Sequence, residues 1–237
     1  MDYLILLSSI VLGGFSVFWF KLDQARHIKL LNTFTGAYLL TLTLLHLLPE
    51  LYQTGVGSND HLKIGGLILA GFFTQIALDV FSMGIEHGHA HHVHHKIPVG
   101  ILAGLCLHAL FEAMALGDPV THHDPESRKL LLWSIVLHNY PVSIALLGML
   151  LHSGLKTGKA VGFLGLFAVM APLGMLLSAH SSLANYSREL MAFVIGIFMH
   201  MSTTILFESG EVHRIKLMKV LAIVVGTALG IASVMVH

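Results

Sequence analysis

Charged residues make up only 11% of this 237-residue chain, while 55% of its residues are hydrophobic and its mean hydropathy is +0.78. Because about a quarter of the residues of a soluble domain are charged, this composition excludes an ordinary soluble protein and indicates a membrane protein. The formal net charge is zero and the sequence has no basic patch, which argues against a nucleic-acid partner.

Apolar stretches separated by short polar breaks recur along the whole chain. A helix needs roughly 20 residues to cross a bilayer core of about 30 Å. Eight stretches approach or exceed that length, near residues 3–20, 28–50, 63–85, 97–117, 130–151, 160–180, 189–208 and 215–236. The breaks leave no room for a soluble domain, so we predict an all-α membrane protein with one transmembrane domain over residues 1–237.

The lysines and arginines are distributed unevenly between the two sides of the predicted bundle. Nine fall on one side, namely Lys21, Arg26, Lys29, Lys96, Lys156, Lys159, Arg214, Lys216 and Lys219. Four fall on the other, namely Lys63, Arg128, Lys129 and Arg188. The positive-inside rule therefore predicts that the first side is cytoplasmic and that both termini are extracytoplasmic.

Ionisable side chains inside the apolar stretches are the first functional candidates, because each costs a few kcal/mol to place in the bilayer core. They are His46, Glu50, Asp79, His108, Glu112, His138, His200 and Glu208. We interpret Asp79, with Gln75 one turn before it, His200 and Glu208 as hydrogen-bonding or gating groups between helices.

His108, Glu112 and His138 are predicted to meet. Residues four apart share a helix face, so His108 and Glu112 project together. At 1.5 Å per residue, His108 lies about 18 Å above the cytoplasmic face and His138 about 13 Å below the outer face, at nearly the same depth. Two imidazoles and one carboxylate suit zinc and similar divalent metals. The alternative is a set of neutral hydrogen-bonding groups, which explains less well why costly groups gather at one depth.

Two further features could assist an ion. Pro141 frees a backbone carbonyl, and a helix broken there could lend that oxygen to a metal. His46 and Glu50 repeat the four-residue spacing near the outer end of the second stretch, where Pro49 is expected to end the helix. They form either an outer metal-access site or a hydrated surface pair, and the sequence leaves both interpretations open.

Residues 86–96 form a predicted cytoplasmic loop that is rich in histidine. Its six imidazoles are His87, His89, His91, His92, His94 and His95. Neutral imidazoles are available near pH 7, so this composition predicts a loop that captures or buffers metal rather than holding it in one fixed geometry.

Three segments resemble motifs of the ZIP (Zrt, Irt-like) family of metal transporters. HALFEAMALG at residues 108–117 is similar to the family pattern HNxPEGxAxG, and HNYPVSIAL at 138–146 is similar to HExPxE or HDxPEG. HLLPEL at 46–51 is a third similar segment. The resemblance covers essentially the whole chain and implies eight spans, outside termini and a histidine-rich cytoplasmic loop. It also implies metal ligands at His108, Glu112, His138 and Asn139.

The sequence departs from the family patterns at four positions. Ala109 stands where the family has asparagine, Phe111 where it has proline, and Val142 where it has glutamate. In MAPLGM, Ala171 stands at what looks like a family glutamate position. The resemblance therefore implies a reduced site for one metal ion, completed by water or another side chain, and the fourth ligand is not identified.

The resemblance implies import of a divalent transition metal, zinc foremost, into the cytoplasm. Zn²⁺ is then the substrate rather than a catalytic cofactor, and the other partners are the lipid bilayer and a second copy of the chain in a homodimer. Spans 1, 4, 5 and 6 would move against spans 2, 3, 7 and 8. The short polar breaks favour a bacterial plasma membrane.

Two rival functions stay open at this point. A membrane metal sensor or non-transporting paralogue is favoured by the missing carboxylates. An intramembrane zinc hydrolase would use three ligands to activate water, but the sequence lacks HExxH and the supporting acids that such an enzyme needs. We therefore expect a protein that is not an enzyme.

Overall fold

The computed structural model describes residues 1–20, 25–53, 60–82, 99–117, 125–207 and 217–236. Within these ranges the chain forms helices and no strands, which confirms the predicted all-α class. The helices are α1 (Asp2–Phe20), α2 (Ala25–Leu42), a π-helical turn (Thr43–Leu47), α3 (Leu48–Gln53), α4 (Asp60–Ser82), α5 (Val99–Met114), α6 (Pro125–His152), α7 (Thr157–His180), a 3₁₀ turn (Ser182–Tyr186), α8 (Ser187–Phe207) and α9 (Leu217–Met235).

Seven helical segments among the described residues are long and apolar enough to cross a membrane. One of them joins α2, the π-helical turn and α3 into a single segment, His27–Gln53. Within the predicted span at 97–117, the described helix is α5, whose 16 residues make about 24 Å of helix against a bilayer core of about 30 Å. Residues 83–98, which precede α5, lie outside the described ranges.

The helix continues through Pro49, so the prediction that this proline ends it is wrong. Proline has no N–H and its ring clashes with the carbonyl four residues earlier, that of Leu45. The chain accommodates this with a wider turn, in which the Leu48 N–H bonds the Thr43 oxygen five residues back. Pro141 likewise lies inside the continuous helix α6, so the helix is not broken there.

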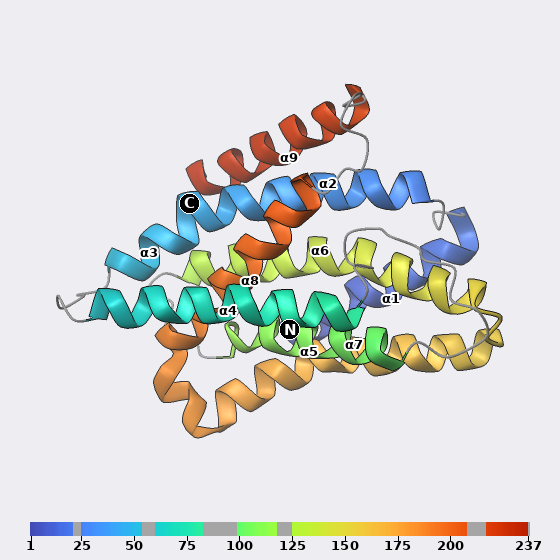
Figure 1. The fold of residues 1–237 in the computed structure, drawn as a ribbon, viewed down its shortest axis with the longest axis horizontal. Coiled ribbons are helices and arrows are strands. Elements are labelled where there is room, and N and C mark those ends of the chain that lie inside the picture. The colour runs from blue at the N-terminus through green and yellow to red at the C-terminus, as the bar shows by residue number, and fades with distance from the viewer. Residues whose placement is uncertain (21–24, 54–59, 83–98, 118–124, 208–216, 237) are drawn as a thin grey trace.

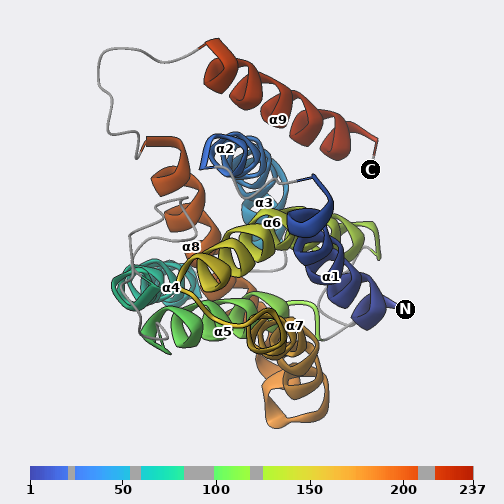
Figure 2. The same cartoon turned by 90° about the vertical axis from the view of Figure 1, so that its right-hand side faces the viewer.

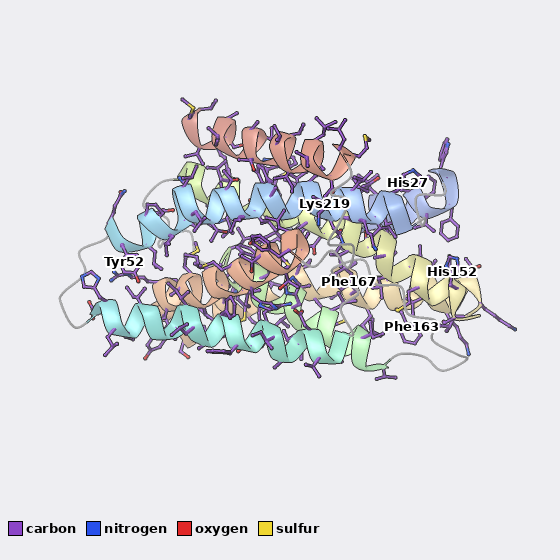
Figure 3. All side chains as sticks on the ribbon, turned by 45° about the horizontal axis from the view of Figure 1, so that its top comes forward. His27, Tyr52, His152, Phe163, Phe167 and Lys219 are labelled. Carbon is purple, nitrogen blue, oxygen red and sulfur yellow. The ribbon has the colours of Figure 1, made fainter. Side chains whose placement is uncertain are left out.

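Helix α6 lies at the centre of the bundle and α9 at its edge (Figure 2). In the most apolar part of α6, 78% of the residues are buried, compared with 11% in α9. Helix α9 packs mainly on α2, and Figure 1 shows the two lying side by side. The side chains of His27 and His152 lie at one end of the bundle and Tyr52 lies at the other (Figure 3). The segment α2–α3 therefore runs antiparallel to α6.

The most extensive helix contacts fall into two groups, which are joined by contacts of α4 with α5 and of α2 with α6. Helix α1 packs on α6 and α7, and α5 packs on α7. Helix α4 packs on α8, and α2 packs on α8 and α9. Glycine allows α4 and α8 to touch through their backbones, because a Cβ at Gly71 would collide with the Phe193 carbonyl and one at Gly196 with the Ile68 carbonyl.

Candidate metal centre

Helix α5 places His108 and Glu112 on one face, as their four-residue spacing predicts. Both side chains are completely buried, and Nε2 of His108 lies 3.6 Å from Oε2 of Glu112. That distance is longer than a hydrogen bond, which ends near 3.2 Å. It is close to the separation of roughly 3.3 Å expected for two ligands at about 2.0–2.1 Å from one tetrahedral zinc.

Helix α6 adds His138 to this pair. Its side chain is also completely buried, and its ring lies edge-on to that of His108, with 5.8 Å between centroids and 78° between planes. His108 therefore has Glu112 and His138 as neighbours, and His138 lies beside it as the antiparallel course of the two spans predicted. They are neighbours rather than a closed ligand set, because no group of three or more His, Cys, Asp or Glu residues in the described ranges is arranged to hold a metal ion.

Asn139, the next residue of α6, is completely buried, and its side-chain amide has no hydrogen-bond partner among the described residues. A buried amide without partners costs about 1–3 kcal/mol in proteins, so such groups usually serve a purpose. The amide oxygen is also a competent metal ligand. The structure therefore retains Asn139 as a candidate beside His138.

A chain of hydrogen bonds leads away from His108 through α4 to α8. Nδ1 of His108 lies 2.9 Å from Oε1 of Gln75, and Nε2 of Gln75 donates to Oδ1 of Asp79 over 2.8 Å. Oδ2 of Asp79 lies 2.7 Å from Nε2 of His200. The sequence suggested hydrogen-bonding roles for these residues but missed their connection to His108. The four-residue step from Gln75 to Asp79 was visible, whereas the link to His200 spans 121 residues.

Comparison with known proteins identifies the family of this chain. Residues 97–235, more than half of the chain and including α5 to α9, match the family model described as ZIP zinc transporter. The chain belongs to the ZIP family. This confirms the resemblance inferred from its motifs, and the family consists of transporters rather than enzymes, as predicted.

Curated relatives of this ZIP chain include zinc transporters named ZIP9. The protein from Xenopus tropicalis is 28% identical over 162 residues, which cover 62% of this chain and 52% of the relative. The protein from Micropogonias undulatus is 27% identical over 176 residues, covering 65% and 56%. The one from Macaca fascicularis is 28% identical over 109 residues, covering 42% and 46%. The chain thus spans about half the length of the curated relatives it matches.

The second His–Glu pair of this ZIP chain lies in a wetter environment. Nε2 of His46 is 3.8 Å from Oε2 of Glu50, and their side chains are 18% and 22% exposed. His46 belongs to the π-helical turn, a feature that often marks functional sites. The two interpretations of this pair, an access site and a hydrated surface pair, both agree with partial exposure.

Three of the positions that depart from the family motifs are fully buried. Ala109, Val142 and Ala171 have no exposed surface, and all three belong to apolar clusters of the core. Their apolar side chains cannot ligate a metal, so these positions contribute packing alone. Glu208 and the predicted histidine loop, with His87, His89, His91, His92, His94 and His95, lie outside the described residues.

Proposed function

We propose that this ZIP chain carries a divalent transition metal, zinc foremost, across the membrane into the cytoplasm through His108, Glu112 and His138. The observation that carries the proposal is the complete burial of these three neighbouring polar side chains in a chain of the ZIP family. Burying them costs free energy that a transporter recovers when an ion binds.

The charge balance of this set suits transient binding. One carboxylate and two neutral imidazoles leave a bound divalent ion with a net charge of about +1, which a dry interior disfavours. Water or the Asn139 amide would complete four-fold coordination. Because transport needs a site that releases its ion, a reduced ligand set with only one carboxylate fits passage better than permanent storage.

The donor types favour zinc-like metals over magnesium or calcium. Imidazole nitrogen is a borderline ligand that suits zinc, copper, iron and nickel, whereas magnesium and calcium require several hard oxygens. The ZIP9 relatives carry the name zinc transporter, which agrees with this preference. A single ion is proposed, because Ala109, Val142 and Ala171 supply no ligand atoms for a second one.

The helix contacts support the proposed movement of two groups of helices. Helices α1, α5, α6 and α7 correspond to the predicted moving spans, and α2, α4, α8 and α9 to the scaffold. The four most extensive contacts lie within these groups, and contacts of α4 with α5 and of α2 with α6 join the groups. A zinc ion would enter past His46 and Glu50, occupy the buried centre and leave toward the histidine loop at residues 86–96. Homodimer formation and a bacterial plasma membrane remain predictions.

Uptake of radioactive zinc into proteoliposomes that contain the full chain tests the proposal. We expect saturable uptake by the wild type and none above empty liposomes for Glu112→Gln, which keeps the shape of the side chain and removes its charge. The control is Glu189→Gln, which removes the ion pair between Glu189 and Lys63. Neither residue belongs to the proposed metal centre, so this variant should take up zinc like the wild type. If the wild type binds zinc but does not take it up, the proposed function becomes that of a sensor. Cleavage of lipid or peptide would indicate an enzyme.

A further inference from the structure

Gln75 in α4 occupies a position that the proposed metal centre does not require for ligation. It is completely buried, and its amide bridges His108 of α5 and Asp79 of its own helix. Asp79 in turn faces His200 of α8, with side-chain exposures of 15% and 13%. The bridge therefore connects a residue of one helix group to two residues of the other.

The chemistry of Asp79 determines how the Gln75 amide is oriented. A carboxylate oxygen only accepts hydrogen bonds, so the group that faces it must be the Gln75 NH₂. The other end of the amide, the Oε1 atom, then faces His108. Because a carbonyl oxygen also only accepts, the His108 Nδ1 must carry the proton and donate it.

This orientation selects one tautomer of the His108 imidazole. In the neutral ring, a proton on Nδ1 leaves the lone pair on Nε2, and Nε2 is the nitrogen that lies 3.6 Å from Glu112. A metal binds only the nitrogen that carries the lone pair. If the Gln75 amide were reversed, Nδ1 would have to accept, Nε2 would carry the proton, and the nitrogen beside Glu112 could not bind an ion.

We propose that Gln75 is a positioning residue that holds His108 in its metal-binding tautomer, and that Asp79, itself bonded to His200, fixes the orientation of Gln75. This inference rests on the proposed function for the identity of the metal ligand. Outer hydrogen-bond partners of this kind typically change metal affinity about 10- to 100-fold when they are mutated.

An exchange of amide and carboxylate tests the proposal directly. In Asp79→Asn, the oxygen of the introduced amide accepts from His200 and its NH₂ donates to Gln75, so the Gln75 amide reverses and the apparent KM for zinc uptake rises about 10- to 100-fold. In the double variant Gln75→Glu with Asp79→Asn, the introduced carboxylate accepts both from the introduced amide and from Nδ1 of His108. The charge of the pair is unchanged, and KM should return close to the wild-type value.

The rescue separates positioning from a purely structural role. If the residues only held α4 against its neighbours, the double variant would be at least as impaired as Asp79→Asn, and that result would overturn the proposal. An unchanged KM in Asp79→Asn would overturn it as well. Glu189→Gln is the matched control, because it removes another polar link between α4 and α8, the ion pair with Lys63, without changing His108 or Gln75. It should leave KM unchanged.

A readout without metal keeps this inference separate from the proposed function. In the full chain with ¹⁵N-labelled histidine, the His108 signals are assigned by their loss in His108→Gln. We expect a protonated Nδ1 in the wild type, a protonated Nε2 in Asp79→Asn, and a protonated Nδ1 again in the double variant. If the wild type takes up no zinc but the three proteins show this protonation pattern, the proposed transport function is wrong while the positioning role of Gln75 is supported. A wild-type His108 protonated on Nε2 would end the inference even if zinc is transported.

Discussion

The two His–Glu pairs of this chain share a spacing and differ in nearly everything around them. His46 and Glu50 are 18% and 22% exposed, whereas His108 and Glu112 are completely buried. The nitrogen–oxygen distances, 3.8 Å and 3.6 Å, are nearly equal. The comparison shows that the four-residue spacing creates a pair, while the surrounding helices decide whether that pair can act on a desolvated ion.

The surroundings differ in a specific way. The inner pair adjoins a third buried ligand candidate, His138, and a glutamine that holds the His108 ring. The outer pair lies where water reaches both side chains, so water screens its charge and can hydrate an approaching ion. We therefore expect the inner pair to determine affinity and the outer pair to affect only the approach of the ion.

The largest difference should come from removing the histidine of each pair. We expect His108→Ala to abolish zinc binding to the purified chain, because the centre loses one of two imidazoles and the buried Glu112 charge loses its neighbour. The equivalent change His46→Ala should lower affinity only a few-fold. Titration calorimetry measures both, and similar losses for the two variants would remove the distinction between the pairs.

His138→Ala tests whether the inner pair needs the third residue. The loss of the His138 imidazole should weaken zinc binding about 10- to 100-fold, the effect typical of losing a group that supports a metal site. The melting temperature of the apoprotein serves as the control for folding. A variant that folds normally and binds zinc like the wild type would exclude His138 from the centre.

Asn139→Leu should move stability and affinity in opposite directions. Replacing a buried amide that has no described hydrogen-bond partner with an apolar side chain of similar size is expected to raise the melting temperature. If the amide oxygen ligates the ion, zinc affinity falls at the same time. An unchanged affinity would leave water as the fourth ligand, and a drop in melting temperature would contradict the account of the amide as unpaired.

The smallest effect is expected at the outer pair. Glu50→Gln should lower kcat/KM for zinc uptake by roughly two- to five-fold, because an exposed charge contributes about 0–1 kcal/mol. The loss should shrink further as ionic strength rises, since salt screens charges that water reaches. Uptake assays at low and high salt check this, and a salt-independent loss would indicate that Glu50 contacts the ion directly.

Helix periodicity and chain direction were sufficient to predict much of the candidate centre. The spacing of His108 and Glu112 fixed their common face, and the antiparallel course of adjacent spans placed His138 at their depth. Pro49 was misjudged, because a π-helical turn that absorbs a proline depends on backbone adjustments that residue types do not reveal.

The part of the site that could not be predicted depends on side chains far apart in the chain. The bond between His108 and Gln75 joins residues 33 positions apart, and the bond between Asp79 and His200 joins residues 121 apart. Each requires particular rotamers as well as the packing of α4 against both α5 and α8. Helix periodicity carries no information about such contacts. The sequence therefore indicated which polar residues take part but not which of them are hydrogen-bonded to one another.

Zinc uptake by Glu112→Gln and Glu50→Gln, measured side by side in proteoliposomes with the wild type, tests the central claim most directly. The two substitutions are chemically identical and differ in the burial and the neighbours of the glutamate. The account predicts uptake at the level of empty liposomes for Glu112→Gln and uptake reduced by no more than a few-fold for Glu50→Gln. Wild-type uptake by Glu112→Gln, or equal losses in both variants, would contradict the claim that the buried pair carries the metal.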